Sequence, residues 1–202
     1  MPAVFPVAYF GNIDYFRKLI ASENTIIETK EHFIKQTVRS RCTILSANGP
    51  LVLSIPIERK NGSKTSMDDA VLSTETDWRK IHWKAIESAY SSAPFFDHYG
   101  PEVHDLIYQT ESSLVKFNAT ITDRIFEWLD LDKKLTFSSE YISPQEALDF
   151  RNDEFDDCSD IRSYTQVFSP SNQFEPNMSI LDLIFCEGPL ARRWIISSQK
   201  IN

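Results

Sequence analysis

The chain has 202 residues and a formal net charge of −8, with 42% apolar and 25% charged residues. This acidic balance, without any run of lysine and arginine, excludes the extended basic face that neutralises phosphates in nucleic-acid binders, so we expect no nucleic-acid partner. The length, together with 14 Phe, 7 Tyr and 4 Trp, excludes a disordered chain and predicts one folded domain over residues 1–202.

The N-terminus and the cysteines give no sign of export or of a metal site. The N-terminus lacks a basic region, and Pro2 and Pro6 interrupt its short apolar stretch, so we expect no signal peptide. No segment approaches the ~18 apolar residues that span a bilayer. Cys42, Cys158 and Cys186 are odd in number and widely spaced, which argues against a disulfide framework and a zinc site. We therefore predict a cytoplasmic protein without a transmembrane segment or a bound metal.

The first part of the chain predicts one helix and then several strands. Asn12 is a suitable N-cap for the helix, and apolar side chains recur behind it at helical spacing. Asn48-Gly49 suits the type I′ turn of a hairpin, and Pro56 indicates an edge strand or a change of partner. The predicted elements are a helix over 12–21 and strands over 25–29, 42–47, 51–57 and 69–73.

The middle of the chain predicts three helices. Asp77 is a suitable N-cap for a helix that runs to about residue 91, Gly100-Pro101 starts a short helix, and Ser112 or Ser113 caps a long one. Apolar or small residues at helical spacing form a packing stripe on each. These positions are Trp78, Ile81, Lys84, Ala85, Ser88 and Ala89, then Val103, Leu106 and Ile107, then Leu114, Phe117, Ile121, Ile125, Trp128 and Leu129.

The last third is mixed and ends in an apolar helix. Residues 135–137 predict a strand, 144–150 a short helix and 164–168 an extended segment. Ser179 caps a nearly all-round apolar helix that Gly188-Pro189 stops. Early strands, a helical middle and a mixed end that includes this buried helix predict an α+β fold.

Asp182 is the strongest candidate for chemistry, because it interrupts the apolar run of the last helix. A buried carboxylate must be paired or must line a pocket, since an unpartnered buried charge is costly. It could act as a general base or orient a ligand. The alternative, which explains the position completely, is an acid in the first helical turn, three residues after the cap Ser179, as in a capping box.

His82 and Arg41 are the other polar candidates. His82 lies four residues after Trp78 on one helix, so both side chains face the same side, where the imidazole could move a proton or line the core edge. Arg41 could bind a carboxylate or phosphate through two hydrogen bonds, or form a structural salt bridge. The acidic residues 153–160 lack the spacing of a calcium loop and predict a solvated loop, although they could bind a hard cation.

Several segments recur along the chain in a characteristic order: Tyr9-Phe10…Tyr15-Phe16, Arg41, Ser54-Ile55-Pro56-Ile57, Trp78…His82…Tyr90…Pro94-Phe95-Phe96…Tyr99, Asn118, Tyr164-Thr165-Gln166 and Phe174…Ser179-Ile180-Leu181-Asp182-Leu183-Ile184-Phe185…Gly188. Taken together in this order, they resemble the WbqC-like family, which is named for genes in bacterial surface-polysaccharide loci. Two positions depart from that pattern: the chain has Phe5-Pro6 instead of a glutamine-proline pair, and Cys186-Glu187 instead of an asparagine before the final glycine.

The resemblance implies a role in modifying surface sugars. It predicts a cytoplasmic transferase that acts on an activated sugar, such as a nucleotide sugar or an amino sugar. His82 or Asp182 would move the proton, Arg41 would hold an anionic group, and aromatic rings would stack on the sugar. The residues expected to line the substrate pocket are Tyr9, Arg41, Trp78, Tyr90, Tyr164 and Gln166. The sequence names no cofactor.

A second hypothesis is a non-catalytic binding or assembly module of a bacterial cell-envelope pathway. It follows from the absence of any recognised nucleophile, phosphate-binding loop or metal motif in the sequence. The apolar segments Phe95-Phe96 and Trp194-Ile195-Ile196 would then form a contact surface. A third hypothesis, a metal-dependent hydrolase, would use the acidic residues 153–160.

Overall fold

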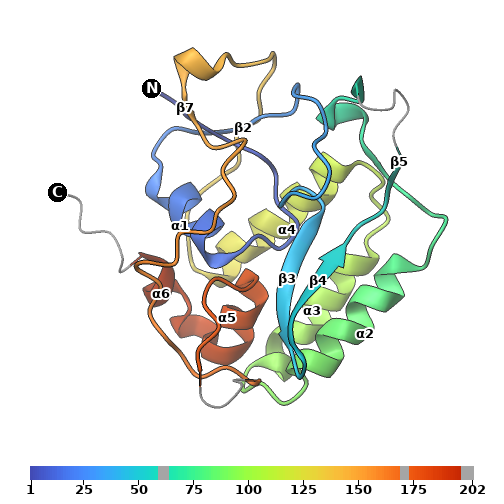
Figure 1. The fold of residues 1–202 in the computed structure, drawn as a ribbon, viewed down its shortest axis with the longest axis vertical. Helices are drawn as coiled ribbons and strands as arrows, with labels where there is room; N and C mark the ends of the chain where they lie inside the picture. The colour runs from blue at the N-terminus through green and yellow to red at the C-terminus, as the bar shows by residue number, and fades with distance from the viewer. Residues whose placement is uncertain (59–63, 169–172, 197–202) are drawn as a thin grey trace.

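A short parallel sheet at the start of the chain organises the fold. Its central strand is β1 (Ala3–Phe5), with β2 (Thr25–Ile27) on one side and β7 (Leu148–Asp149) on the other. Helix α1 (Ile13–Ala21) connects β1 to β2, as parallel neighbours require a crossover. The structure, a computed structural model, describes residues 1–58, 64–168 and 173–196, and it confirms the predicted α+β class (Figure 1).

A long antiparallel hairpin of β3 (Arg41–Ser46) and β4 (Gly49–Ser54) crosses the molecule, with α5 and α6 on one side of the view and α2 and α3 on the other (Figure 1). The predicted type I′ turn is wrong, because Ala47 and Asn48 form the turn and only Gly49 has a positive φ, of 99°. Pro56 does mark a change of partner. After it, β5 (Ile57–Glu58) pairs with β6 (Val71–Leu72) and no longer with β3.

Three helices form the middle of the chain, as predicted, and further short elements complete it. Ser113 caps the third of these helices by accepting from the Lys116 amide, and its predicted stripe is buried except at Trp128, which is half-buried. None of the described helices combines the length and the apolar character that a membrane crossing requires. The remaining elements are α2 (Trp78–Tyr90), α3 (Phe96–Tyr108), α4 (Leu114–Trp128), α5 (Ile180–Glu187), α6 (Arg192–Ile196) and the 3-10 turns Met67–Asp69, Pro144–Glu146 and Gly188–Leu190.

Three local predictions are wrong. The stripe of α2 is shifted, since Ile81 is 62% exposed while His82 and Ile86 are buried. Helix α3 starts before Gly100-Pro101, and Pro101 lies within it. Residues 144–150 are not a helix, because a single 3-10 turn is followed by β7, which pairs with β1. In that segment the ladder of a distant strand outweighs the local helix signal of a serine followed by a proline.

The end of α5 is fixed by close packing at Gly188. This residue has a φ of 55° and a ψ of −128°, a backbone conformation that only glycine adopts without strain. A Cβ atom built on Gly188 would lie 2.5 Å from the Phe95 ring. The amide of Phe95 also donates to the Phe185 carbonyl at 3.0 Å, so α5 and the start of α3 are held together at this point.

We predict that Gly188→Ala lowers the free energy of unfolding by about 3 kcal/mol, because it adds backbone strain and a clash with a ring. Gly49→Ala is the matched control. Gly49 also has a positive φ but has open space around it, so about 1 kcal/mol is expected from strain alone. Urea denaturation of both variants measures the difference. Equal losses in the two variants would contradict the packing at Gly188.

Candidate functional site

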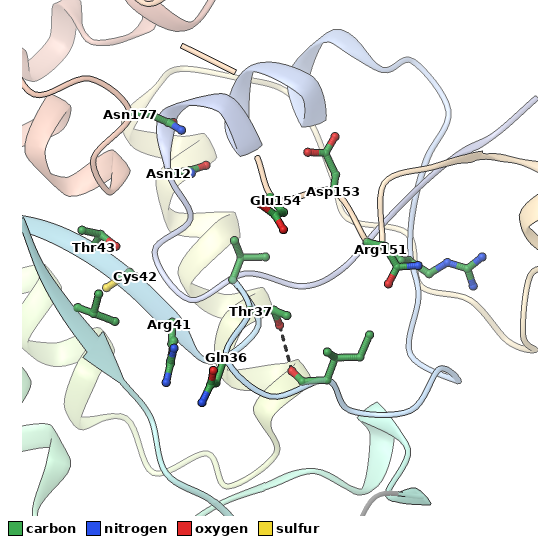
Figure 2. Close-up of a pocket in the computed structure, with 14 residues that line it drawn as sticks. Asn12, Gln36, Thr37, Arg41, Cys42, Thr43, Arg151, Asp153, Glu154 and Asn177 are labelled. Carbon is green, nitrogen blue, oxygen red and sulfur yellow. Dashed lines mark hydrogen bonds between the residues drawn. The ribbon is translucent and has the colours of Figure 1, made fainter. Parts of the chain in front are cut away.

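A cavity of about 540 Å³ lies at the carboxyl edge of the parallel sheet. The segment that follows β7 supplies one wall, with Asn152 and Glu154, and the segment that follows β1 supplies Asn12. Strand β3 supplies Arg41, and a loop before it supplies Gln36. The carboxyl edge of a parallel sheet is where α/β proteins generally hold their ligands. Figure 2 shows polar side chains from these separate segments around the cavity.

Two asparagines seal the end of the cavity nearest α1. The Nδ2 groups of Asn12 and Asn177 both donate to the Phe155 carbonyl, each at 2.7 Å. Asn12 Oδ1 accepts from the Tyr15 amide at 3.0 Å, and Asn177 Oδ1 accepts from the Asp14 amide at 2.9 Å. These bonds occupy the first N–H groups of α1. The helix therefore offers no free backbone donors to a phosphate, unlike a phosphate-binding loop.

Backbone strain gathers around this cavity. Gln36 and Asn177, which line it, have φ angles of 63° and 59°, and Phe155, which accepts from the asparagines, has 51°. Non-glycine residues adopt such angles at a cost and keep them only where the surroundings fix them. Strained backbone of this kind is commonest at binding and catalytic sites.

A largely buried set of charged residues lies next to the cavity, which it reaches through Arg151. Arg151 donates to both carboxylate oxygens of Asp149 at 2.8 Å and also contacts Glu28 at 3.3 Å. Arg39 pairs with Glu31 and donates to the Arg151 carbonyl at 2.9 Å. Hydrogen bonds from Arg151 lower the pKa of Asp149, whereas burial raises the pKa of Glu31 in spite of Arg39. The charges of Arg39 and Arg151 are therefore compensated by carboxylates within the protein.

Arg41 is different, because it lines the cavity without a carboxylate partner. Its Nε donates to Ser54 Oγ at 3.4 Å, and no Asp or Glu of the described part of the chain lies within salt-bridge distance. Figure 2 shows that the Arg151 side chain turns away from the cavity. Among the described residues that line the cavity, Arg41 is therefore a cation without a carboxylate partner. An arginine in such a position suits a phosphate or a carboxylate.

The sequence model of the WbqC-like protein family matches residues 7–153, which is most of the chain and most of the cavity wall. The chain belongs to the WbqC-like protein family. Its relatives include the uncharacterized protein Rv1507c of Mycobacterium tuberculosis (strain ATCC 25618 / H37Rv), at 24% identity over 207 residues, 86% of this chain and 88% of that protein. No solved structure matches the chain.

Three of the predicted site residues of this WbqC-like protein form a buried cluster behind β3. The Tyr9 hydroxyl lies 2.9 Å from His82 Nδ1, and the Trp78 ring packs edge-on against His82 at 5.2 Å between centroids. Burial lowers the pKa of His82 to about 4, although a hydrogen bond to the Ser54 backbone opposes the shift. The imidazole is therefore neutral near pH 7, donating to Ser54 and accepting from Tyr9. Cys42 lines the cavity in front of this cluster.

Four others form a second buried cluster beside α5. Asp182 Oδ2 accepts from the Tyr164 hydroxyl at 2.6 Å and from Gln166 Nε2 at 2.8 Å. Burial, and secondarily the Asp182 carboxylate, raise the pKa values of Tyr90 and Tyr164, and burial raises that of Asp182 itself. Asp182 does lie in the first turn of α5 after the cap Ser179, but no capping box forms, because the Ser179 amide donates to the Thr43 carbonyl. The carboxylate instead fastens residues 164–166 to the helix.

Of the eight predicted site residues, only Arg41 lines the cavity. His82 and Asp182 belong to separate clusters that no hydrogen bond joins within the described residues, and their catalytic roles stay predictions. The sequence singles out Asn12 only as a cap and Glu154 only as one of the acidic residues 153–160, and it does not single out Gln36 or Asn152. Recognising β7 would have pointed to Asn152 and Glu154, because they follow its carboxyl end.

We predict that His82 makes the fold sensitive to acid. Its pKa is lowered from 6.5 to about 4 in the folded state, so the unfolded chain binds the proton more readily between these values. Stability from His82 is therefore full above pH 6.5 and falls by about 3 kcal/mol as the pH drops to 4. The difference in unfolding free energy between wild type and His82→Gln should shrink over this range. A pH-independent difference would contradict a neutral, buried His82.

We predict that Asp182 is required for stability. Asp182→Ala leaves the Tyr164 hydroxyl and one Gln166 N–H bond without an acceptor, which lowers the free energy of unfolding by about 3 kcal/mol. Asp182→Asn keeps an oxygen acceptor and removes a buried charge, so its loss should be below about 1 kcal/mol. Chemical denaturation of both variants measures the two losses. If Asp182→Ala were as stable as wild type, the cluster would not hold the segment in place.

Proposed function

We propose that this protein is a cytoplasmic transferase that modifies an activated sugar in surface-polysaccharide biosynthesis, and that the sugar binds in the cavity lined by Arg41. Family membership supports the pathway, because the family is named for genes of such loci. The free thiols of Cys42, Cys158 and Cys186 fit a reducing compartment. The observation that carries the proposal is the uncompensated Arg41 in a polar cavity at the carboxyl edge of the sheet.

The side chains that remain free in the cavity suit a hydroxyl-rich ligand. Within the described part of the chain, no hydrogen bond or ion pair is made by the side chains of Gln36, Thr43, Asn152 or Glu154, all of which line the cavity. Amides, a hydroxyl and a carboxylate supply both donors and acceptors, as a sugar ring requires. Arg41 would bind the phosphate of the activated sugar through two parallel hydrogen bonds.

In this proposal the residue that accepts the proton lines the cavity. The sequence assigns it to His82 or Asp182, but both are buried outside the cavity and engaged with Tyr9 and Tyr164. Glu154 is an exposed carboxylate on the cavity wall without a described partner. We therefore propose that the hydroxyl or amine of the acceptor attacks the anomeric carbon of the activated sugar, and that the bond from this carbon to the phosphate oxygen breaks. Glu154 accepts the proton of the attacking group, while Arg41 stabilises the charge on the departing phosphate.

The alternative, a non-catalytic assembly module, loses its expected contact surface. The Phe95 ring packs against Gly188, and Phe96 stacks on Trp83 at 6.0 Å and contacts Phe185 at 5.2 Å. In the C-terminal segment, Ile195 is buried. These apolar side chains belong largely to the hydrophobic core of the chain and do not form a free patch.

We predict that Arg41→Gln weakens the binding of glucose 1-phosphate and UDP-glucose by at least about tenfold, because it removes a charge-assisted contact to phosphate. Its unfolding temperature without ligand should stay unchanged, since within the described residues the Arg41 side chain makes a single weak hydrogen bond. Isothermal titration calorimetry and thermal shift measure the two effects. Arg124→Gln is the matched control, since Arg124 pairs with acids on the helical surface. The same loss in both variants, or no binding of either compound to wild type, would contradict the proposal.

A further inference from the structure

A second cavity, of about 470 Å³, adjoins the first at the same edge of the sheet. The two share Ile34, Arg151 and Asn152 as wall residues, so they form neighbouring parts of one groove. Residues 30–32, which follow β2, supply another wall of the second cavity. Each cavity is within the size range of small-molecule sites. A transferase needs two substrates side by side, and this groove has room for two.

The charges of the two cavities differ. In the second, Lys30 pairs with Asp68, and Arg151 pairs with Asp149 and Glu28. The cations that line it are thus compensated by carboxylates of the protein, whereas Arg41 in the first cavity is not. A phosphate would find no free cation in the second cavity, because binding one there would require breaking an existing ion pair. The second cavity therefore favours an uncharged ligand.

An exposed aromatic ring in the second cavity indicates which class of uncharged ligand would bind there. Tyr141 lines the second cavity and is 55% exposed, and the Arg151 guanidinium lies 4.9 Å from its ring centroid. Arg151 is itself buried and held by Asp149, so the ring rests on a fixed support. An exposed ring with an imidazole, His32, and an amide, Asn152, nearby suits the apolar face and the hydroxyls of a pyranose.

We propose that the second cavity is a binding subsite for a neutral pyranose, the acceptor sugar, which stacks on Tyr141 next to the activated sugar in the first cavity. This inference rests on the proposed function of the first cavity, and it adds the substrate class of the second. It explains why the groove has an unpaired cation at one end only. It also explains why an aromatic ring stays exposed on a protein whose other rings are mostly buried.

The experiment is a titration of the ¹⁵N-labelled full-length chain with methyl β-D-glucopyranoside and methyl N-acetyl-β-D-glucosaminide, to about 50 mM, followed by amide chemical shifts. We expect shifts at residues 30–32, 141–144 and 152. Tyr141→Ala should weaken this binding about tenfold, while Tyr141→Phe, which keeps the ring, should retain it. Tyr108→Ala is the matched control, because Tyr108 is 40% exposed and lines neither cavity.

A parallel titration with glucose 1-phosphate separates this inference from the proposed function. Its shifts should gather at residues 36–43 and 152–154, should be lost in Arg41→Gln and should persist in Tyr141→Ala. If glucose 1-phosphate behaves in this way but neither pyranoside shifts the second cavity, the subsite is wrong and the proposed function stands. Pyranoside binding that is unchanged in Tyr141→Ala also overturns the subsite. If none of the three compounds binds, both proposals fail.

Discussion

The carboxylate of Glu28 is the interaction on which the carboxyl edge of the sheet depends. It is fully buried and receives Arg151 Nη1 at 3.3 Å, Ser138 Oγ at 2.6 Å, and the amides of Lys30 and Ile142 at 2.8 Å and 2.9 Å. A buried carboxylate is tolerated only with such a set of partners, and losing one partner of a buried pair costs several kcal/mol. Two of the partners lie in residues 138–142 and one follows β7, so satisfying this charge also fixes where these two segments lie against the end of β2.

The ion pairs and hydrogen bonds around Glu28 determine the shape and the charge of the two cavities. The backbone that leaves β2 and the backbone that leaves β7 are both tied to the same charges, so the walls that they form are held in place before any ligand arrives. Because Arg151 is paired with carboxylates, it is not available to a ligand, and Arg41 on β3 is the cation that a ligand in the first cavity can reach. The two ends of the groove therefore differ in charge: the cations of the second cavity are paired with carboxylates, whereas Arg41 in the first cavity is not.

The sequence predicts those elements whose signals are local. The caps at Asn12, Ser113 and Ser179 all accept the expected amide, because a cap and the stripe behind it involve residues within one or two turns. Trp78 and His82 are four residues apart on one helix, and their rings are in contact, as this spacing predicts. The stripe of α2 was shifted because its sequence mixes small, polar and aromatic residues, so several phases fit equally well.

Long-range pairing accounts for what the sequence does not reveal. Strand β7 is two residues long and is strand only because β1 lies beside it, so residues 144–150 read as a helix from their own composition. With β7 unrecognised, residues 152–154 read only as part of a solvated acidic loop, although they follow the carboxyl end of a central sheet. His82 and Asp182, to which the sequence assigns proton transfer, turn out to be buried and hydrogen-bonded to Tyr9 and Tyr164 inside the protein.

Hydrogen–deuterium exchange with and without UDP-glucose tests most directly whether the carboxyl edge is the ligand site. Backbone amides are protected where a ligand binds and orders the chain. The account predicts protection in residues 36–43 and 150–154, which surround the cavity assigned to the activated sugar. Protection confined to residues 164–166 and 180–187, around Asp182, would contradict it, as would an unchanged exchange pattern with the sugar nucleotide in excess.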